Sequence, residues 1–154
     1  MDFQFGSTTD GRPVKIVSIV DERTRECLGG LVDRSITSEH LITELDRLAA
    51  GRGYPAVLRC DNGPELACAA MSEWAGERTG LWFIPPDQSW RYGYIESFNG
   101  RLRDECLNIN LFWSLTHARV VIADWKEEYN HHRPHSALRY QVPPARYAAA
   151  RTDQ

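Results

Sequence analysis

Two acidic residues of this chain stand where carboxylates often do chemistry, and they belong to separate segments. Asp61 ends the apolar run "AVLRC" and is followed by Asn62, Gly63 and a proline, a turn-forming sequence. This places the carboxylate at the carboxyl end of a predicted strand, where the sites of open α/β sheets form. Taken alone, an aspartate before Asn-Gly also fits a turn former or a helix cap.

Glu96 is the second acid, and it lies on a predicted helix. The apolar stripe of that helix is formed by Ile95, Phe98, Leu102 and Cys106. Asn99 and Arg103 follow Glu96 three and seven positions later and share its face, so that face is polar. A solvent-facing glutamate is the alternative interpretation.

Asp2 opens the first predicted strand, "DFQFG". If that strand lies beside the one that ends at Asp61, the two carboxylates meet, and Glu96 approaches from a helix packed against the sheet. Three clustered carboxylates repel one another unless a cation neutralises them. Oxygen-only ligation favours Mg²⁺ or Mn²⁺. Two such ions, about 3.5–4 Å apart, would activate an attacking hydroxyl and stabilise the leaving oxygen at a phosphodiester.

The elements that must position these acids follow from hydrophobic periodicity. Residues 2–6, 14–22 and 26–32 predict three strands in an antiparallel meander, with two glycines in the third that allow a close neighbour or a bulge. Residues 37–53 predict a helix, with Leu41, Ile42, Leu45, Leu48 and Ala49 inward and Glu39, Glu44, Asp46 and Arg47 outward.

The second half continues with a strand at 56–60, a helix over about 64–79, a short strand at 81–86 and a loop at 87–93. The chain is helical from Tyr94. A last long helix covers about 115–131, with Ala118, Ile122, Trp125 and Tyr129 inward. This order predicts one α/β domain over residues 1–154, a mixed sheet covered by helices, with a Pro-rich tail from about 133.

Composition narrows the class of protein. No apolar run among the 154 residues approaches the length of a membrane span, and no signal peptide precedes the first strand, so we expect a cytoplasmic protein. The four cysteines, Cys27, Cys60, Cys68 and Cys106, form no Cys-x-x-Cys pair and predict reduced, buried thiols. "HHRPH", with His131, His132 and His135, lacks the spacing of a zinc site. The net charge is −3, but residues 91–154 carry a small basic excess.

The motifs together resemble a known family. "GRPVKIVSIVDERTREC", "RCDNGPEL", "GYIESFNGRLRDECLN" and "YNHHRPHSAL" are similar to the integrase-type catalytic core of bacterial insertion-sequence transposases. These are DDE transposases, related to retroviral integrases. The resemblance covers about residues 2 to 147. Glu96 follows Asp61 by 35 positions, which is one residue shorter than the commonest spacing in the wider superfamily.

The resemblance implies a ribonuclease H-like fold with a mixed five-stranded sheet flanked by helices. It matches the three metal-binding acids of the family to Asp2, Asp61 and Glu96, with Mg²⁺ or Mn²⁺ as two ions. It further implies hydrolysis of DNA at the ends of an insertion sequence, followed by strand transfer of the freed 3′-hydroxyl. DNA contacts are expected from Asn62, Trp90, Arg91, Tyr94, Asn99 and Arg103. Core packing for Trp90 and a surface ion pair for Arg103 are the alternatives.

Partners are implied in the same way. DNA, as transposon ends and target, and a homo-oligomer in the bacterial nucleoid are expected, without a membrane. Nothing in the chain matches the helix-turn-helix DNA-binding region of family proteins, so we expect an excised core or a truncated reading frame, with that region separate or missing. A hydrolysis-only nuclease of the same fold and a non-catalytic remnant that binds DNA or a partner remain as alternatives.

Overall fold

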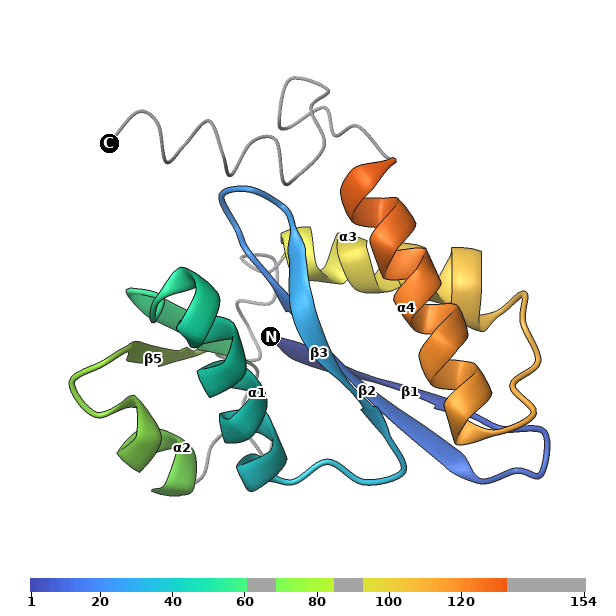
Figure 1. The fold of residues 1–154 in the computed structure, drawn as a ribbon, viewed down its shortest axis with the longest axis horizontal. Coiled ribbons are helices and arrows are strands. Elements are labelled where there is room, and N and C mark those ends of the chain that lie inside the picture. Colours follow the sequence, from blue (N-terminus) through green and yellow to red (C-terminus); the bar gives the residue numbers. More distant parts are fainter. Residues whose placement is uncertain (61–68, 85–92, 133–154) are drawn as a thin grey trace.

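The computed structural model describes residues 1–60, 69–84 and 93–132. Five strands lie within these ranges, as predicted. β1 (Asp2–Ser7), β2 (Pro13–Val20) and β3 (Cys27–Asp33) form the predicted antiparallel meander, in the order β1-β2-β3 (Figure 1). β4 (Val57–Cys60) and β5 (Gly80–Phe83) form a parallel pair. The Met1 ammonium donates to the carbonyl oxygen of Arg59 at 2.8 Å, so the start of β1 lies beside β4.

The helices lie on both faces of the sheet (Figure 1). They are α1 (Ser38–Arg52), α2 (Ala69–Ala75), α3 (Gly93–Leu102), the π-helical turn η2 (Arg103–Leu107) and α4 (Leu115–His131). The predicted bounds of α4 are confirmed, and the Ser114 hydroxyl caps this helix by accepting from the His117 amide. α2 ends four residues earlier than predicted, because Gly76 adopts a φ of 44° that leaves the helical region.

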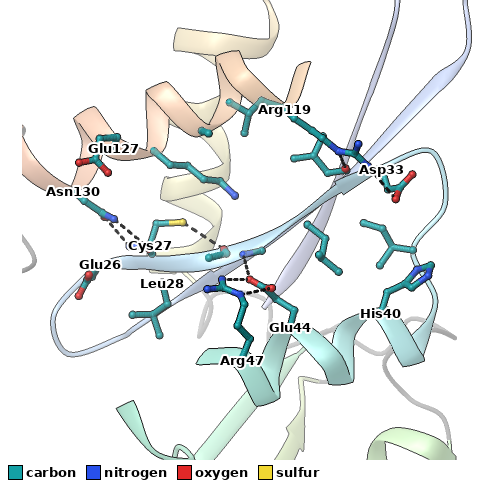
Figure 2. A pocket seen from close by; sticks show the side chains of 18 of the residues that line it. Glu26, Cys27, Leu28, Asp33, His40, Glu44, Arg47, Arg119, Glu127 and Asn130 are labelled. Carbon is teal, nitrogen blue, oxygen red and sulfur yellow. Dashed lines mark hydrogen bonds and ion pairs between the residues drawn. The ribbon is translucent and has the colours of Figure 1, made fainter. Parts of the chain in front are cut away.

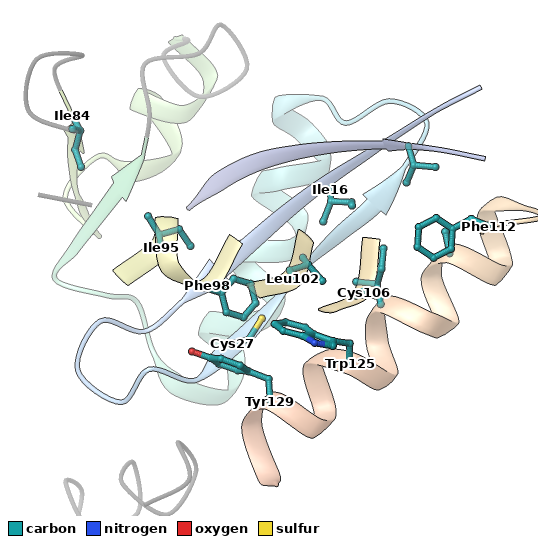
Figure 3. Packing of buried hydrophobic residues seen from close by; sticks show 13 residues of the cluster. Ile16, Cys27, Ile84, Ile95, Phe98, Leu102, Cys106, Phe112, Trp125 and Tyr129 are labelled. Atoms are coloured by element: carbon teal, nitrogen blue, oxygen red, sulfur yellow. The ribbon is translucent and has the colours of Figure 1, made fainter. Parts of the chain in front are cut away.

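Two apolar cores separate the sheet from its helices, and alternation along β2 divides its residues between them. Val17 and Ile19 pack with α1 and α2, whereas Val14 and Ile16 pack with α3 and α4. The predicted stripe of α3 is confirmed in the second core: Ile95, Phe98, Leu102 and Cys106 are all buried (Figure 3). Phe98 stands edge-on to Trp125 and Tyr129, at ring-centroid distances of 5.4 and 4.9 Å, which fixes α3 against α4.

The prediction for one residue of α1 is wrong. Glu44 was expected to point outward, but it is 7% exposed. Its Oε1 accepts from the Gly30 amide at 3.2 Å and from the Arg47 guanidinium at 2.6 Å. A Cβ at position 29 would lie 2.7 Å from that oxygen, so the glycine pair in β3 makes room for the carboxylate. The predicted close approach at these glycines is thus confirmed, and the carboxylate is buried because it satisfies a strand amide.

Cys27, Cys60 and Cys106 are buried thiols that form no disulfide among the described residues, as predicted; Cys68 lies outside those residues. No helix within the described ranges has the length and apolar content needed to cross a bilayer.

Candidate active site

Asp2 is held at the start of β1 by contacts from two directions. It stands opposite Ser18 of β2 in the antiparallel register. Its Oδ1 accepts from the Phe3 amide at 2.8 Å, and its Oδ2 accepts from the side-chain amide of Asn99, on α3, at 3.3 Å. The carboxylate is partly buried and oriented on the face of the sheet that α3 and α4 cover.

Glu96 lies on the first turn of α3 and is exposed. Asn99, one helical turn later, is 8% exposed and makes the bond to Asp2. The Gln4 side chain donates to the Asn99 carbonyl oxygen at 2.7 Å, so β1 holds both the side chain and the backbone of Asn99. Because residues three apart lie on one side of a helix, Glu96 projects from the side of α3 that faces the start of β1.

Three buried oxygen atoms around Asp2 lack a hydrogen-bond partner among the described residues. They are Gln4 Oε1, Ser18 Oγ and Asn99 Oδ1. Gln4 shares the face of Asp2 because it lies two positions along the strand, and Ser18 shares it through the register. Buried polar atoms are nearly always paired, so three such oxygens near one carboxylate mark a candidate place for a ligand.

Four of the residues predicted for the site, Asp61, Asn62, Trp90 and Arg91, lie outside the described residues. Asp61 follows directly on Cys60, the last residue of β4. The Met1–Arg59 hydrogen bond brings that strand to the start of β1. Within the described ranges no three acidic, histidine or cysteine side chains are grouped closely enough to hold a metal ion.

Tyr94, the residue from which the chain was predicted to be helical, is the second residue of α3. Its hydroxyl donates to Glu22 Oε1, in the turn between β2 and β3. Burial, together with this bond to a carboxylate, raises the pKa of the phenol, which therefore stays protonated. Arg103 opens η2, is exposed, and forms no ion pair within the part of the chain that the structure describes. The DNA contacts assigned to these two residues and to Asn99 stay predictions.

Sequence reasoning missed Gln4, Ser18 and Glu22. The signal for Gln4 was present, since it is a polar residue at an inward position of β1, two residues from Asp2. Ser18 likewise interrupts the apolar run of β2. The bonds of Glu22 join residues distant in the sequence and have no local signature.

A hollow of about 770 Å³ lies elsewhere, along the open edge of β3 between α1 and α4 (Figure 2). The polar side chains around it bind one another and the strand. Asn130 donates to and accepts from the backbone of Cys27, and Arg119 donates to the Val32 carbonyl oxygen and pairs with Asp33. Neither Asp2 nor Glu96 lines this hollow, so it is separate from the acidic residues.

The chain matches two family models that share the description "Integrase core domain", over residues 1–80 and 78–143. It is 43% identical over 150 residues to the 31.7 kDa protein of insertion element IS407 from Burkholderia multivorans. It is 44% identical over 151 residues to the 39.2 kDa protein of insertion element IS476 from Xanthomonas euvesicatoria. Each alignment covers 97% of this chain, but 54% and 43% of those proteins, so the chain spans about half their length.

Solved structures give the fold. A chain of the simian T-cell lymphotropic virus intasome in complex with PP2A regulatory subunit B56 gamma superposes with a TM-score of 0.63 at 16% identity, over 84% of this chain and 47% of that one. The HTLV-2 integrase catalytic core domain in complex with magnesium superposes with a TM-score of 0.57 at 15% identity, over 88% and 86%. The expected ribonuclease H-like fold is confirmed. Within the described residues, however, the five strands pair as an antiparallel sheet of three and a parallel sheet of two, and not as the single mixed sheet that was expected.

Proposed function

Since the chain belongs to the integrase core domain family of insertion elements, we propose that it is the catalytic core of a DDE-type DNA transposase. Its reaction is hydrolysis of DNA at the ends of an insertion sequence and transfer of the freed 3′-hydroxyl to a second phosphodiester. The observation that carries the proposal is the Asn99–Asp2 hydrogen bond. It ties the helix of one candidate acid to the carboxylate of another.

The donor chemistry fits a divalent cation. Asp2, Asp61 and Glu96 would hold Mg²⁺ or Mn²⁺, as one or two ions, through oxygen atoms alone. Two further observations support this set: the oriented Asp2 carboxylate and the three buried oxygens near it that have no partner among the described residues. Bound there, the cation would supply charge neutralisation and activation of the attacking oxygen at phosphorus.

The chain's own residues have the complementary task of orientation. The Asn99 amide and the Phe3 amide each bond one oxygen of Asp2, and so orient the carboxylate. Gln4 holds α3 in register with β1 through the Asn99 carbonyl oxygen. These bonds fix the position of α3, and thus of Glu96, along the strand that carries Asp2.

DNA would lie along the exposed side of α3 and η2. Arg103 is exposed there and available to a phosphate, and Asn62, Trp90, Arg91 and Tyr94 are the other candidates. Joining two DNA ends to a target requires more than one active site, so the working form is a homo-oligomer. Recognition of the element's ends would fall to a helix-turn-helix DNA-binding region separate from this core, as the resemblance to the transposase family implies.

Calorimetric titration of Mn²⁺ into the protein, with and without duplex DNA, tests the proposal. Binding should be lost in Glu96→Gln and in Asp61→Asn. Incubation of a supercoiled plasmid with a labelled oligonucleotide then separates the reactions, because a transposase core joins the 3′-hydroxyl to the plasmid and a nuclease only nicks it. A wild-type chain that neither binds Mn²⁺ in the presence of DNA nor cuts the plasmid would overturn the proposal and favour the non-catalytic remnant.

A further inference from the structure

Glu22, in the turn between β2 and β3, joins two elements through a single oxygen atom. The Tyr94 hydroxyl, from α3, donates to its Oε1. The Arg59 guanidinium, from β4, lies 3.1 Å from the same atom.

The two partners of Glu22 stand next to candidate acids in the sequence. Tyr94 precedes Glu96 by two residues, on the first turn of α3. Arg59 precedes Asp61 by two residues, in β4. The bonds of Glu22 therefore hold α3 and β4 at residues that lie two positions before a candidate acid.

Aromatic and cationic neighbours hold this cluster in place. The Arg25 guanidinium lies over the Tyr94 ring, 5.2 Å from its centroid, and the Arg59 guanidinium lies over the Trp82 ring of β5, at 4.7 Å.

The turn that carries Glu22 is itself fixed. Asp21 Oδ1 accepts from the backbone amides of Arg23 and Thr24, which closes the turn. Arg52, in the last turn of α1, donates to Glu26 at 2.6 Å on the far side of the turn. The Arg59 and Glu22 side chains are 35% and 41% exposed, and an ion pair so exposed contributes little by itself. The positioning effect therefore comes from the fixed turn on which the carboxylate stands.

We infer that Glu22 is a positioning residue, which holds the first turn of α3, and with it Glu96, against β4 so that Glu96 can reach a cation at the end of that strand. This inference rests on the proposed function, and it concerns a residue that would touch neither cation nor DNA. Groups that orient metal ligands from behind typically change metal affinity by about 10- to 100-fold when removed.

The matched variants are Glu22→Ala, Tyr94→Phe and Tyr54→Phe. Tyr54 is the control because its hydroxyl donates to a carboxylate, Asp46, at 3.1 Å and an arginine, Arg78, lies over its ring, and neither partner belongs to α3 or β4. In Glu22→Ala and Tyr94→Phe, the Kd for Mn²⁺ should rise by about 10-fold. In Tyr54→Phe it should not change. Glu22→Gln, which keeps the acceptor for Tyr94 but loses the charge, should fall between wild type and Glu22→Ala.

Hydrogen exchange supplies a readout that does not depend on the metal. The amides of residues 97–99 bond to carbonyl oxygens of the first turn of α3, so their exchange should be faster in Glu22→Ala and unchanged in Tyr54→Phe. Unchanged exchange at these amides, or an unchanged Kd for Mn²⁺ where exchange has become faster, would overturn the inference. A wild-type chain that binds no Mn²⁺ would refute the proposed function instead, and it would leave the exchange comparison to decide whether Glu22 positions α3.

Discussion

Two asparagines, Asn99 on α3 and Asn130 on α4, are each 8% exposed, and each reaches from a helix to the meander. Asn130 bonds the amide and the carbonyl oxygen of Cys27, at 2.9 and 2.8 Å, so both ends of its side chain are satisfied. Asn99 donates to the Asp2 carboxylate, and its Oδ1 has no partner among the described residues. Two asparagines of equal burial thus have different roles: one binds a strand backbone and the other binds a carboxylate.

The residues around Asn130 and those around Asn99 also differ in how completely their polar atoms are paired. Along the open edge of β3, Asn130, Glu44 and Arg119 occupy backbone groups that would otherwise offer an unpaired strand edge to another chain (Figure 2). Around Asp2, by contrast, buried oxygens find no hydrogen-bond partner within the ranges that the structure describes. Complete pairing indicates a structural role, and incomplete pairing beside an oriented carboxylate indicates a place for a ligand.

The largest effect is expected from a substitution at Glu96, on the side of the proposed metal site. Glu96→Gln should lower DNA cleavage in Mn²⁺ by about a thousandfold, because several kcal/mol of transition-state stabilisation would be lost with the cation. Folding should be intact or slightly improved, since repulsion between carboxylates falls. Plasmid nicking and thermal unfolding measure the two effects. Glu73→Gln, at an exposed glutamate of α2, is the control, and equal activity of Glu96→Gln would remove Glu96 from the site.

A substitution at the β3 edge should have the opposite effect: it should change the stability of the fold and not the chemistry. At Gly30, φ is 145° and an added Cβ would lie 2.0 Å from the Val17 carbonyl oxygen. Gly30→Ala should therefore destabilise the fold by about 3 kcal/mol, through clash and backbone strain. At Gly100, on α3, an added Cβ meets nothing within 4 Å, so Gly100→Ala should stabilise by about 0.5–1 kcal/mol. Urea unfolding measures both, and a stable Gly30→Ala would contradict the packing at this edge.

Much of this contrast could not be predicted from the sequence, for a physical reason. The stripe of α3 and the bounds of α4 were predictable because helical periodicity and the Ser114 cap are local signals. The bond between Asp2 and Asn99 joins residues 97 positions apart. Glu44 was placed outward because charged side chains usually are, and only the amide of Gly30, on another element, explains its burial.

Exchanging alanine for each asparagine tests the comparison directly. Asn99→Ala should raise the Kd for Mn²⁺ by about 10- to 100-fold, because Asp2 loses the group that orients it. Asn130→Ala should leave that Kd unchanged and lower the free energy of unfolding by about 2 kcal/mol, because it leaves a buried amide and carbonyl unpaired. Calorimetry measures the Kd for Mn²⁺ and urea unfolding measures the stability, each for both variants. Loss of Mn²⁺ binding in Asn130→Ala, or none in Asn99→Ala, would end the distinction.

The smallest expected effect concerns Arg103, which lies beyond the Asp2 contacts on the exposed side of η2. If it binds a DNA phosphate, Arg103→Glu should weaken binding of duplex DNA and reduce the slope of log K against log salt by about one, the share of a single phosphate contact. Arg12→Glu, with the same change of charge in the turn between β1 and β2, should leave the slope nearly unchanged. Fluorescence anisotropy across a salt series measures both. Equal slopes in the two variants would mean that Arg103 acts only through net charge, and that DNA follows another face than the one beside Glu96.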